Sequence, residues 1–392
     1  MKCEWTVVQL SDILQEKGYI RGPFGSALKR GDMKKDGIPV YEQQHAIYNS
    51  RDFRYYIDEQ KFNEMKRFQV RKDDLIISCS GTVGKVSIIK DDDPKGIISQ
   101  ALLLLRADTN RILPQYLKYF FSSRDGYNAI VSRSSGSVQV NIAKRSVIEQ
   151  ILLKLPQIKT QKKIVGVLSS IDDKIELNNA INNNLEQQAQ AIYQQMFVEN
   201  ASSNWSEGTL SNIADITMGQ SPSGSSYNED GIGTVFFQGR AEFGFRFPSV
   251  RLYTTEPKRM ACKNDTLMSV RAPVGDLNVA HTDCCIGRGL AAIHSKTNHQ
   301  SFVLYTMFSL KKQLDVFNGE GTVFGSINRK ALNDMPVLIP SIEVIEKFER
   351  IVAPMDATIR NNYDEICRLQ DIRDSLLPRL MSGEIDVSNI DL

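Results

Sequence analysis

Two stretches of the chain place mostly hydrophobic residues at alternating steps of four and three positions. The first lies between Thr160 and Glu199, and adding 184 to its residue numbers gives the second. In the first stretch these positions are Ile164, Leu168, Ile171, Ile175, Asn178, Asn182, Leu185, Ala189, Ile192 and Met196. In the second they are Phe348, Val352, Met355, Ile359, Asn362, Ile366, Leu369, Arg373, Leu376 and Leu380. This spacing is typical of helices that pack lengthwise on each other.

We therefore expect two long antiparallel helices with a coiled-coil-like seam, each roughly 60 Å long at 1.5 Å per residue. Asn178 and Asn362 fall at the same place in the two seams, and we expect this pair to fix the register at some cost in stability. Pro354 predicts a kink in the second helix, and Pro378 and Gly383 predict its end. The alternative is two amphipathic helices that are buried separately.

The duplication extends beyond the helices. Trp5 to Ile13 and Trp205 to Ile213 share a Trp, a Leu-Ser pair and an Ile at an offset of 200. Further matching pairs are Asp74–Gly84 with Asp265–Gly275, Gly136–Ile142 with Gly321–Ile327, and Leu155-Pro156 with Ile339-Pro340. The changing offset indicates loops of different length on a shared framework. Only two copies are present, so the chain is an internal duplication and not a solenoid.

Each copy begins with short β-branched runs separated by Gly, Pro, Asn and Ser, which predict strands and turns. In the first copy the runs are Asp74–Ser78, Val86–Ile89 and Ile97–Leu105, and Pro114–Ser122 predicts a helix. The expected fold class is α+β, with two small mixed α/β domains that contain twisted sheets and are related by a pseudo-twofold duplication. The boundaries that we predict are 1–155 and 201–340 for the two domains, and 156–200 and 341–392 for the helices.

The overall charge of +2 is unevenly distributed. Residues 1–155 contain 25 Lys and Arg against 18 Asp and Glu, a net of +7, whereas residues 341–392 contain 6 against 11, a net of −5. Residues 156–200 have a net of −1 and residues 201–340 a net of +1. Basic surface favours phosphate, and acidic helices favour a protein partner over DNA. The six cysteines form no Cys-x-x-Cys pair and are interpreted as reduced thiols, and no metal site is predicted.

No catalytic constellation is recognisable. Ser80-Gly-Thr-Val-Gly-Lys85 lacks the spacing of a phosphate-binding loop, because only two residues separate its glycines. The stretch is open to two interpretations, a tight turn or a DNA contact through Ser80, Thr82 and Lys85. Asp172-Asp-Lys174 mimics the end of a nuclease motif but has no upstream acid, so we interpret it as a solvated helix face. The Pro-Pro pair of adenine methyltransferases is absent.

The remaining candidates are polar and basic residues on Gly-rich loops. Arg reads guanine, Gln and Asn read adenine, and Lys and Ser hold phosphate, so these residue types suit DNA contact. The candidates in the first copy are Ser26, Lys29, Arg30, Gln43, Gln44, Ser80, Thr82, Lys85, Gln100, Arg133, Ser137, Gln139, Asn141 and Lys144. In the second copy they are Ser223, Gln238, Arg240, Arg259, Arg271, Arg288, Asn328, Arg329 and Lys330. Taken alone, a residue of this kind is more often an ordinary surface residue than a DNA contact.

Several motifs resemble the specificity subunit of type I restriction-modification enzymes. The most specific is the C-terminal stretch from Leu369 to Val387, which contains Ser-Leu-Leu-Pro-Arg-Leu-Met-Ser-Gly-Glu-Ile. Gln161-Lys-Lys-Ile-Val165, Ile171-Asp-Asp-Lys-Ile175, Arg21-Gly-Pro-Phe-Gly-Ser26 and Gly81-Thr-Val-Gly-Lys85 are also similar to that family. The resemblance covers essentially the whole chain. The departures from the family lie in the globular regions. These regions vary among members of the family because they determine which DNA sequence is recognised.

The resemblance implies a non-catalytic subunit with two target recognition domains, each of which reads one half of a bipartite site in double-stranded DNA. The helices would set the spacing and dock two methyltransferase subunits, and restriction and translocase subunits would join the assembly. This chain would bind no cofactor, because S-adenosylmethionine, ATP and Mg would bind to the partners. We expect a cytoplasmic protein, because no apolar run reaches the length of a membrane span and the N-terminus lacks a signal-peptide core.

Two alternatives belong to other classes of protein. A self-sufficient DNA methyltransferase or nuclease would need the motifs that are missing here. A structural coiled-coil adaptor would need no Gly-rich loops and no basic first domain.

Overall fold

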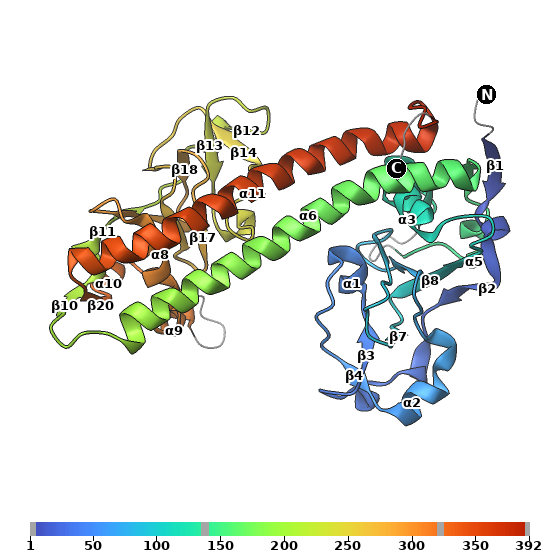
Figure 1. Ribbon diagram of the computed structural model, residues 1–392, viewed down its shortest axis with the longest axis horizontal. Coiled ribbons are helices and arrows are strands. Elements are labelled where there is room, and N and C mark those ends of the chain that lie inside the picture. Colours follow the sequence, from blue (N-terminus) through green and yellow to red (C-terminus); the bar gives the residue numbers. More distant parts are fainter. Residues whose placement is uncertain (1–4, 135–140, 320–324, 389–392) are drawn as a thin grey trace. The chain divides into compact units, whose positions relative to one another are not determined.

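The computed structural model describes residues 5–134, 141–319 and 325–388, and it divides into two units. Unit 1 comprises residues 1–176 and 365–392, and unit 2 comprises residues 177–364. Each unit combines a globular domain with a segment of each of two long helices, α6 (Ile158–Tyr193) and α11 (Ile342–Ser382) (Figure 1). A π-helical turn, Gln194–Glu199, continues α6. The two long helices that the sequence predicts are therefore present.

The domain of unit 1 is built on three small sheets with strand orders β2-β8-β5-β6, β4-β3-β7 and β1-β9. Its strands are β1 (Thr6–Gln9), β2 (Leu14–Arg21), β3 (Ile38–Tyr41), β4 (Tyr56–Ile57), β5 (Leu75–Ser78), β6 (Val86–Ile88), β7 (Ile97–Ile98), β8 (Leu102–Ala107) and β9 (Leu152–Leu155). Its helices are α1 (Gln43–Tyr48), α2 (Glu59–Glu64), α3 (Pro114–Ser122), α4 (Arg124–Val131) and α5 (Arg145–Ile148). Helix α3 has the bounds that the sequence predicts.

Both faces of the four-stranded sheet of unit 1 are covered, which explains the uninterrupted apolar run of β8. Leu103 and Leu105 point into a core that they share with α3 and the long helices. Leu102 and Leu104 alternate with them and point into a second core on the opposite face. Successive side chains of a strand point to opposite faces, so a strand that is covered on both sides needs apolar residues at every position.

The domain of unit 2 has sheets with strand orders β11-β19-β16-β17, β12-β14-β13-β18-β15 and β10-β20. Its strands are β10 (Ser206–Thr209), β11 (Ala214–Met218), β12 (Tyr227–Asn228), β13 (Thr234–Phe237), β14 (Leu252–Thr254), β15 (Met260–Ala261), β16 (Thr266–Ser269), β17 (Leu277–Val279), β18 (Cys284–Ile286), β19 (Leu290–Ser295) and β20 (Pro336–Ile339). Its helices are α7 (Leu210–Ile213), α8 (Gln300–Ser309), α9 (Lys311–Asp315) and α10 (Arg329–Asn333).

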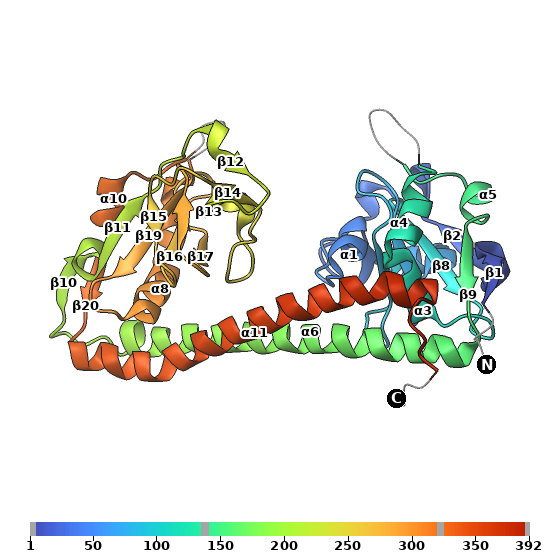
Figure 2. The same cartoon turned by 90° about the horizontal axis from the view of Figure 1, so that it is seen from above.

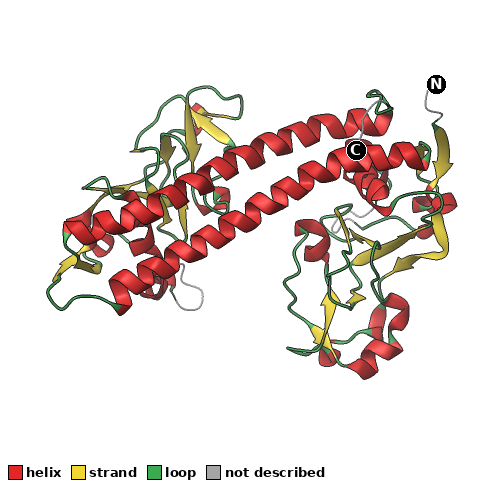
Figure 3. Cartoon of the chain, in the orientation of Figure 1, coloured by secondary structure: helices red, strands yellow, loops and turns green. Residues whose placement is uncertain are grey.

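The two domains share a topology, so the fold contains the duplication that the sequence predicts. The order β2-β8-β5-β6 corresponds to β11-β19-β16-β17, and both sheets are antiparallel throughout. In each domain a second sheet contains one parallel pair, β3 with β7 in unit 1 and β13 with β18 in unit 2. Both domains contain helices as well as strands (Figure 3). The predicted α+β class is confirmed.

In one respect the strands of unit 1 differ from the prediction. The stretch Ile97–Leu105 forms two strands and not one, because the chain turns between Ser99 and Ala101. The backbone N–H of Ser99 donates to the carbonyl of Tyr41 over 2.8 Å, whereas Leu102 begins β8 in the other sheet. The apolar run therefore conceals a passage from one sheet to the next.

Helices α6 and α11 run antiparallel within each unit, and they lie side by side in both views (Figures 1 and 2). In unit 1, Asp172 pairs with Arg373 over 3.2 Å and Lys174 pairs with Glu365 over 3.4 Å. In unit 2, Asn182 bonds with Asn362 over 2.8 Å. Residue numbers thus rise on one helix as they fall on the other.

Every position of the two seams is buried or half-buried. Those that are less than a tenth exposed are Ile164, Leu168, Ile175, Asn178, Asn182, Ala189, Phe348, Val352, Ile359, Ile366 and Leu380. The half-buried ones are Ile171, Leu185, Ile192, Met196, Met355, Asn362, Leu369, Arg373 and Leu376. Asn362 bonds with Asn182, which lies one seam position beyond its repeat equivalent Asn178, because antiparallel helices pair a position of one seam with a different position of the other.

Helix α11 continues through both of its prolines. Pro354 is exposed and lies within the 41 helical residues, so it does not end the helix. Pro378 lies four residues before the last helical residue and not at the end. Gly383 follows with a φ of 78°, which is the left-handed conformation that commonly ends a helix.

Candidate nucleic-acid interface

The loops that follow β2, β3, β5 and β7 meet at one end of the domain in unit 1. Backbone hydrogen bonds hold them together: Gly22 N–H donates to Leu102 O over 2.9 Å, and Ile142 N–H donates to Cys79 O over 2.9 Å. Gly22 approaches Ser99 so closely that a Cβ would lie 2.0 Å from its carbonyl oxygen. A residue other than glycine would separate these loops.

Four of the predicted DNA-contacting residues lie together at this end and form the first loop cluster: Gln43, Ser80, Gln100 and Asn141. Ser80 Oγ donates to Asn141 Oδ1 over 2.9 Å, and the backbone N–H of Ser80 donates to Gln43 Oε1 over 3.1 Å. Gln100 is exposed in the turn between β7 and β8. The cluster presents amides and hydroxyls and no charge of its own.

The equivalent loops of unit 2 form the second loop cluster: Gln238, Arg271, Arg288 and Ser326. A bridge joins Arg271 to Ser326, as one joins Ser80 to Asn141 in unit 1. Ile327 N–H donates to Val270 O over 3.1 Å, which corresponds to the bond between Ile142 and Cys79. Gln238, Arg271 and Arg288 are exposed. The two clusters have the same backbone construction, but the second carries two guanidinium groups.

The turn Ser80–Lys85 has the geometry that a tight turn requires, with φ values of 67° at Gly81 and 87° at Gly84. Thr82 is exposed at its tip. Lys85 points toward α4, with its Nζ 5.1 Å from the centre of the Tyr127 ring. In unit 2 the equivalent residue is Asp276, which pairs with Arg240 and, over 3.1 Å, with Lys311. Arg240 therefore lies outside the second loop cluster.

The other candidates of the first domain lie apart from the cluster. Lys29 and Arg30 are exposed beside a 3-10 turn, and Lys144 is the residue before α5. Gln44 donates to Asp52 O over 3.1 Å and Arg133 donates to Ala129 O over 2.8 Å, so both make local contacts. Ser137, Gln139 and the side chain of Ser26 lie outside the described part of the chain.

Several candidates of the second domain also make local contacts. Ser223 and Ser225 share a hydrogen bond of 2.8 Å, and Asn328 Oδ1 accepts from Ala331 N–H and caps α10. Arg329 and Lys330 are exposed in the first turn of that helix. Arg259 is exposed, and its carbonyl accepts from Ile286 N–H next to the parallel strand pair.

The sequence interpretation missed the residues that attach each domain to the long helices. Asp172 is not on a solvated face: its carboxylate accepts from Tyr119 Oη over 2.8 Å and pairs with Lys118 over 2.9 Å. Burial raises the pKa of Asp172, but Lys118, Tyr119 and Arg373 outweigh burial and bring the pKa below its usual value. Asp356 occupies the equivalent position 184 residues later, and this recurrence was visible in the sequence.

Neither a metal-binding group nor a membrane span is found among the described residues. No group of three or more His, Cys, Asp or Glu residues there could hold a metal ion, and no helix there is long and apolar enough to cross a membrane. Cys79, Cys284 and Cys285 are buried free thiols. Burial raises the pKa of Cys79 to about 12.

Comparison with known proteins gives a consistent result. Residues 2–187 match the type I restriction modification DNA specificity domain. The MjaX specificity subunit of Methanocaldococcus jannaschii is 28% identical over 98% of this chain and 94% of its own length. The HindI specificity subunit of Haemophilus influenzae is 23% identical over 81% of this chain and 87% of its own.

A solved structure shares the fold. The type I restriction-modification S subunit from M. genitalium has a TM-score of 0.62 and 16% identity, and the match covers 97% of this chain and 96% of that chain. This likeness agrees with the two domains and two long helices described above. The match of residues 2–187 to this specificity domain, and the similarity of nearly the whole chain to curated specificity subunits, confirm the resemblance seen in its motifs.

Proposed function

We propose that this chain is the DNA sequence-specificity subunit of a type I restriction-modification assembly, and that each loop cluster reads one half of a bipartite site. The observation that carries the proposal is the recurrence of one construction: the bridge between Ser80 and Asn141 in unit 1 is repeated between Arg271 and Ser326 in unit 2. Two copies of one framework with different exposed side chains suit two readers of different sequences.

The two clusters favour different bases. Amide side chains such as Gln43 and Asn141 match the donor and acceptor pair of adenine in the major groove, whereas guanidinium groups such as Arg271 and Arg288 match the two acceptors of guanine. We therefore propose that the first half-site contains an adenine, and the second a guanine, among the bases that are read directly.

The chain itself is proposed to be non-catalytic. The target adenine would be modified by methyltransferase subunits that bring S-adenosylmethionine, and restriction subunits would supply the ATP- and Mg-dependent steps. The acidic segments 156–200 and 341–392 suit a protein partner better than DNA. The long helices would set the spacing between the two half-sites.

The test is a genome-wide map of N6-methyladenine in cells with the chain and its methyltransferase partner, and in cells with the partner alone. A split motif that depends on the chain supports the proposal. Methylation that is identical in both cells would contradict it and favour a structural adaptor. Methylation by the isolated chain with S-adenosylmethionine would instead establish a self-sufficient methyltransferase.

The variant Arg288→Ala refines the test, because it removes a guanidinium from the second loop cluster. It should relax the second half of the motif and leave the first half intact. Arg251→Ala is the matched control: Arg251 is equally an exposed arginine of unit 2, but it pairs with Glu229 and Glu242 on the domain surface. Relaxation of both half-sites by Arg288→Ala would mean that the clusters do not read independently.

A further inference from the structure

Each domain contacts the long helices through a tyrosine and an aspartate, and this contact occurs once in each unit. In unit 1, Tyr119 of α3 donates to Asp172 of α6 over 2.8 Å. In unit 2, Tyr305 of α8 donates to Asp356 of α11 over 2.9 Å. Asp172 and Asp356 are 184 residues apart, which is the repeat distance of the two helices. Both copies have therefore kept a tyrosine hydroxyl on the helix carboxylate.

In both units, positively charged side chains also pair with the aspartate. These side chains come from different elements in the two units. In unit 1, Asp172 pairs with Lys118 of the domain over 2.9 Å and with Arg373 of α11 over 3.2 Å. We call Lys118, Tyr119, Asp172 and Arg373 the first latch. These four side chains join the domain to both long helices of its unit.

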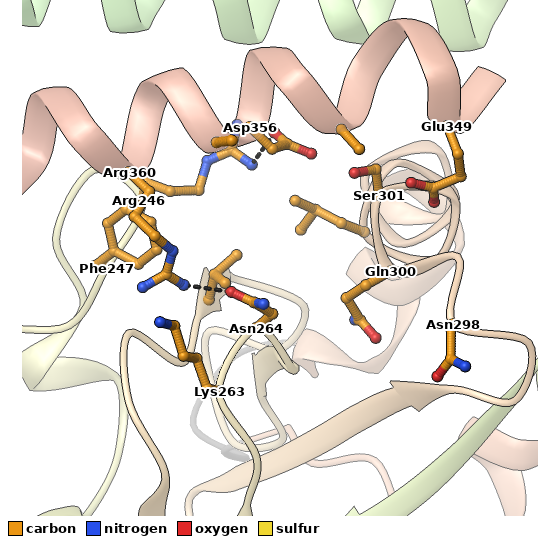
Figure 4. A pocket seen from close by; sticks show the side chains of 14 residues that line it. Arg246, Phe247, Lys263, Asn264, Asn298, Gln300, Ser301, Glu349, Asp356 and Arg360 are labelled. Atoms are coloured by element: carbon orange, nitrogen blue, oxygen red, sulfur yellow. Dashed lines mark hydrogen bonds and ion pairs between the residues drawn. The ribbon is translucent and has the colours of Figure 1, made fainter.

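The second latch consists of Glu186, Arg246, Tyr305 and Asp356. Arg246 belongs to the domain and is 4% exposed, and it pairs with Asp356 of α11 over 3.1 Å and with Glu186 of α6 over 2.9 Å. Figure 4 shows Arg246 and Asp356 at the wall of a pocket of about 370 Å³ between this domain and α11. One buried guanidinium thus joins the domain to both helices of its unit.

A second contact point lies beside each latch. In unit 1, Lys90 follows β6 and pairs with Glu176 of α6 over 2.6 Å. In unit 2 the equivalent of Lys90 is His281, whose carbonyl accepts from Arg360 of α11 over 2.8 Å. Glu176 and Arg360 are again 184 residues apart. His281 also contacts Asp364 of α11 through Nε2 over 2.7 Å, so the two units use different side chains at this second contact point.

Apolar contacts also join each domain to the helices, together with other hydrogen bonds, such as the one that Phe302 N–H donates to Glu349 of α11 over 2.8 Å. Leu117 and Leu168 share one core in unit 1, and Phe302 and Phe348 share one core in unit 2. Apolar burial holds surfaces together without fixing a direction, whereas hydrogen bonds and ion pairs weaken steeply with angle and distance. We propose that the two latches are positioning devices that fix the angle of each recognition domain on its helices, and so restrict the spacer length that the chain accepts. This inference rests on the proposed function.

The experiment maps N6-methyladenine with the complete assembly that contains Tyr119→Phe or Tyr305→Phe. Either change removes one hydroxyl and keeps the buried ring. Tyr116→Phe and Tyr227→Phe are the matched controls, because these hydroxyls donate within their own domains, to Lys154 O over 3.1 Å and to Pro222 O over 3.0 Å. Lys118→Met tests the first latch independently and keeps the aliphatic stem of the side chain.

The latch variants should keep both half-site sequences and raise methylation at sites whose spacer is one base pair longer or shorter by roughly ten-fold, the factor that corresponds to about 1.4 kcal/mol. The controls should keep a single spacer. A single spacer in all latch variants, or the same broadening in the controls, would overturn the inference. If the unmodified chain directs no split motif, the proposed function itself fails, and the comparison of variants with the unmodified chain separates the two results.

Discussion

Asn362 donates from Nδ2 to Oδ1 of Asn182 over 2.8 Å, within the seam of α6 and α11 in unit 2. Asn182 is 2% exposed and Asn362 is half-buried. A polar pair at this place interrupts a mostly apolar stripe, and a shifted register would leave its amides against apolar side chains. The pair therefore specifies one register of the antiparallel helices at a cost in stability.

A double-mutant cycle tests the role of this pair. Asn182→Leu leaves the amide of Asn362 without its partner and should lower the free energy of unfolding by about 1–3 kcal/mol. Adding Asn362→Leu should recover most of that loss, because two apolar residues then face each other. Urea unfolding followed by circular dichroism measures all four proteins. A double variant that is less stable than both single variants would contradict this account of the pair.

The apolar positions of the seam can be tested with a charge. Ile359 is 0% exposed, and Ile359→Asp would bury a carboxylate without a partner between the helices, at a cost of about 3–5 kcal/mol. Ile351 lies on the same helix and is 43% exposed, so Ile351→Asp should change the stability by less than about 0.5 kcal/mol. Equal losses in thermal unfolding experiments would show that Ile359 does not occupy a buried seam.

The sequence was informative where a local rule decides the structure. Alternating steps of four and three give a helix with one apolar face, and α6 and α11 follow that pattern. Pro114 suits the first position of a helix, and α3 begins there. Gly383 ends α11 because it adopts a positive φ. Each of these features depends on a few neighbouring residues.

Features that depend on distant residues were not predictable in the same way. The pairing of Asn362 with Asn182 depends on the antiparallel offset of two helices. Which asparagine of α6 pairs with Asn362 is therefore decided by how the two helices pack, and not by the sequence pattern of either helix. Gln43, Ser80, Gln100 and Asn141 lie together because four loops meet at one end of the domain, whereas Lys29 and Lys85, which were equally candidates for DNA contact, lie elsewhere. Residue type alone made all of these residues equally good candidates for DNA contact.

Asp172 predicts a dependence of stability on pH. Its pKa in the folded protein is below the usual 3.8, because Lys118, Tyr119 and Arg373 outweigh the effect of burial. A carboxylate with a lowered pKa stabilises the fold fully above pH 3.8, and the stabilisation is lost as the pH falls through the folded pKa. Asp172→Asn should therefore destabilise the protein by about 1–3 kcal/mol at pH 7 and by progressively less below pH 3.8.

Melting temperatures of the unmodified protein and of Asp172→Asn across this pH range measure the effect. Asp173→Asn is the matched control, because Asp173 is the exposed neighbour of Asp172 on the same helix. A difference between Asp172→Asn and the unmodified protein that stays constant from pH 7 to pH 3 would mean that Asp172 is not ionised in the first latch.

The independence of the two loop clusters can be measured by DNA binding with one change in each cluster. Arg271→Ala removes a guanidinium from the second cluster and should weaken binding by about 1–3 kcal/mol to duplexes with an intact second half-site. Once the second half-site is mutated, Arg271→Ala should have little further effect, because the contact is already lost. Asn141→Ala should show the same pattern for the first half-site, with a smaller effect because an amide carries no charge.

Titrations of the assembled complex against four duplexes, with neither, either or both half-sites mutated, measure the coupling between the two clusters directly. If Arg271→Ala weakened binding equally to all four duplexes, Arg271 would contact the phosphate backbone, and direct reading of a base would have to come from other residues of the second cluster.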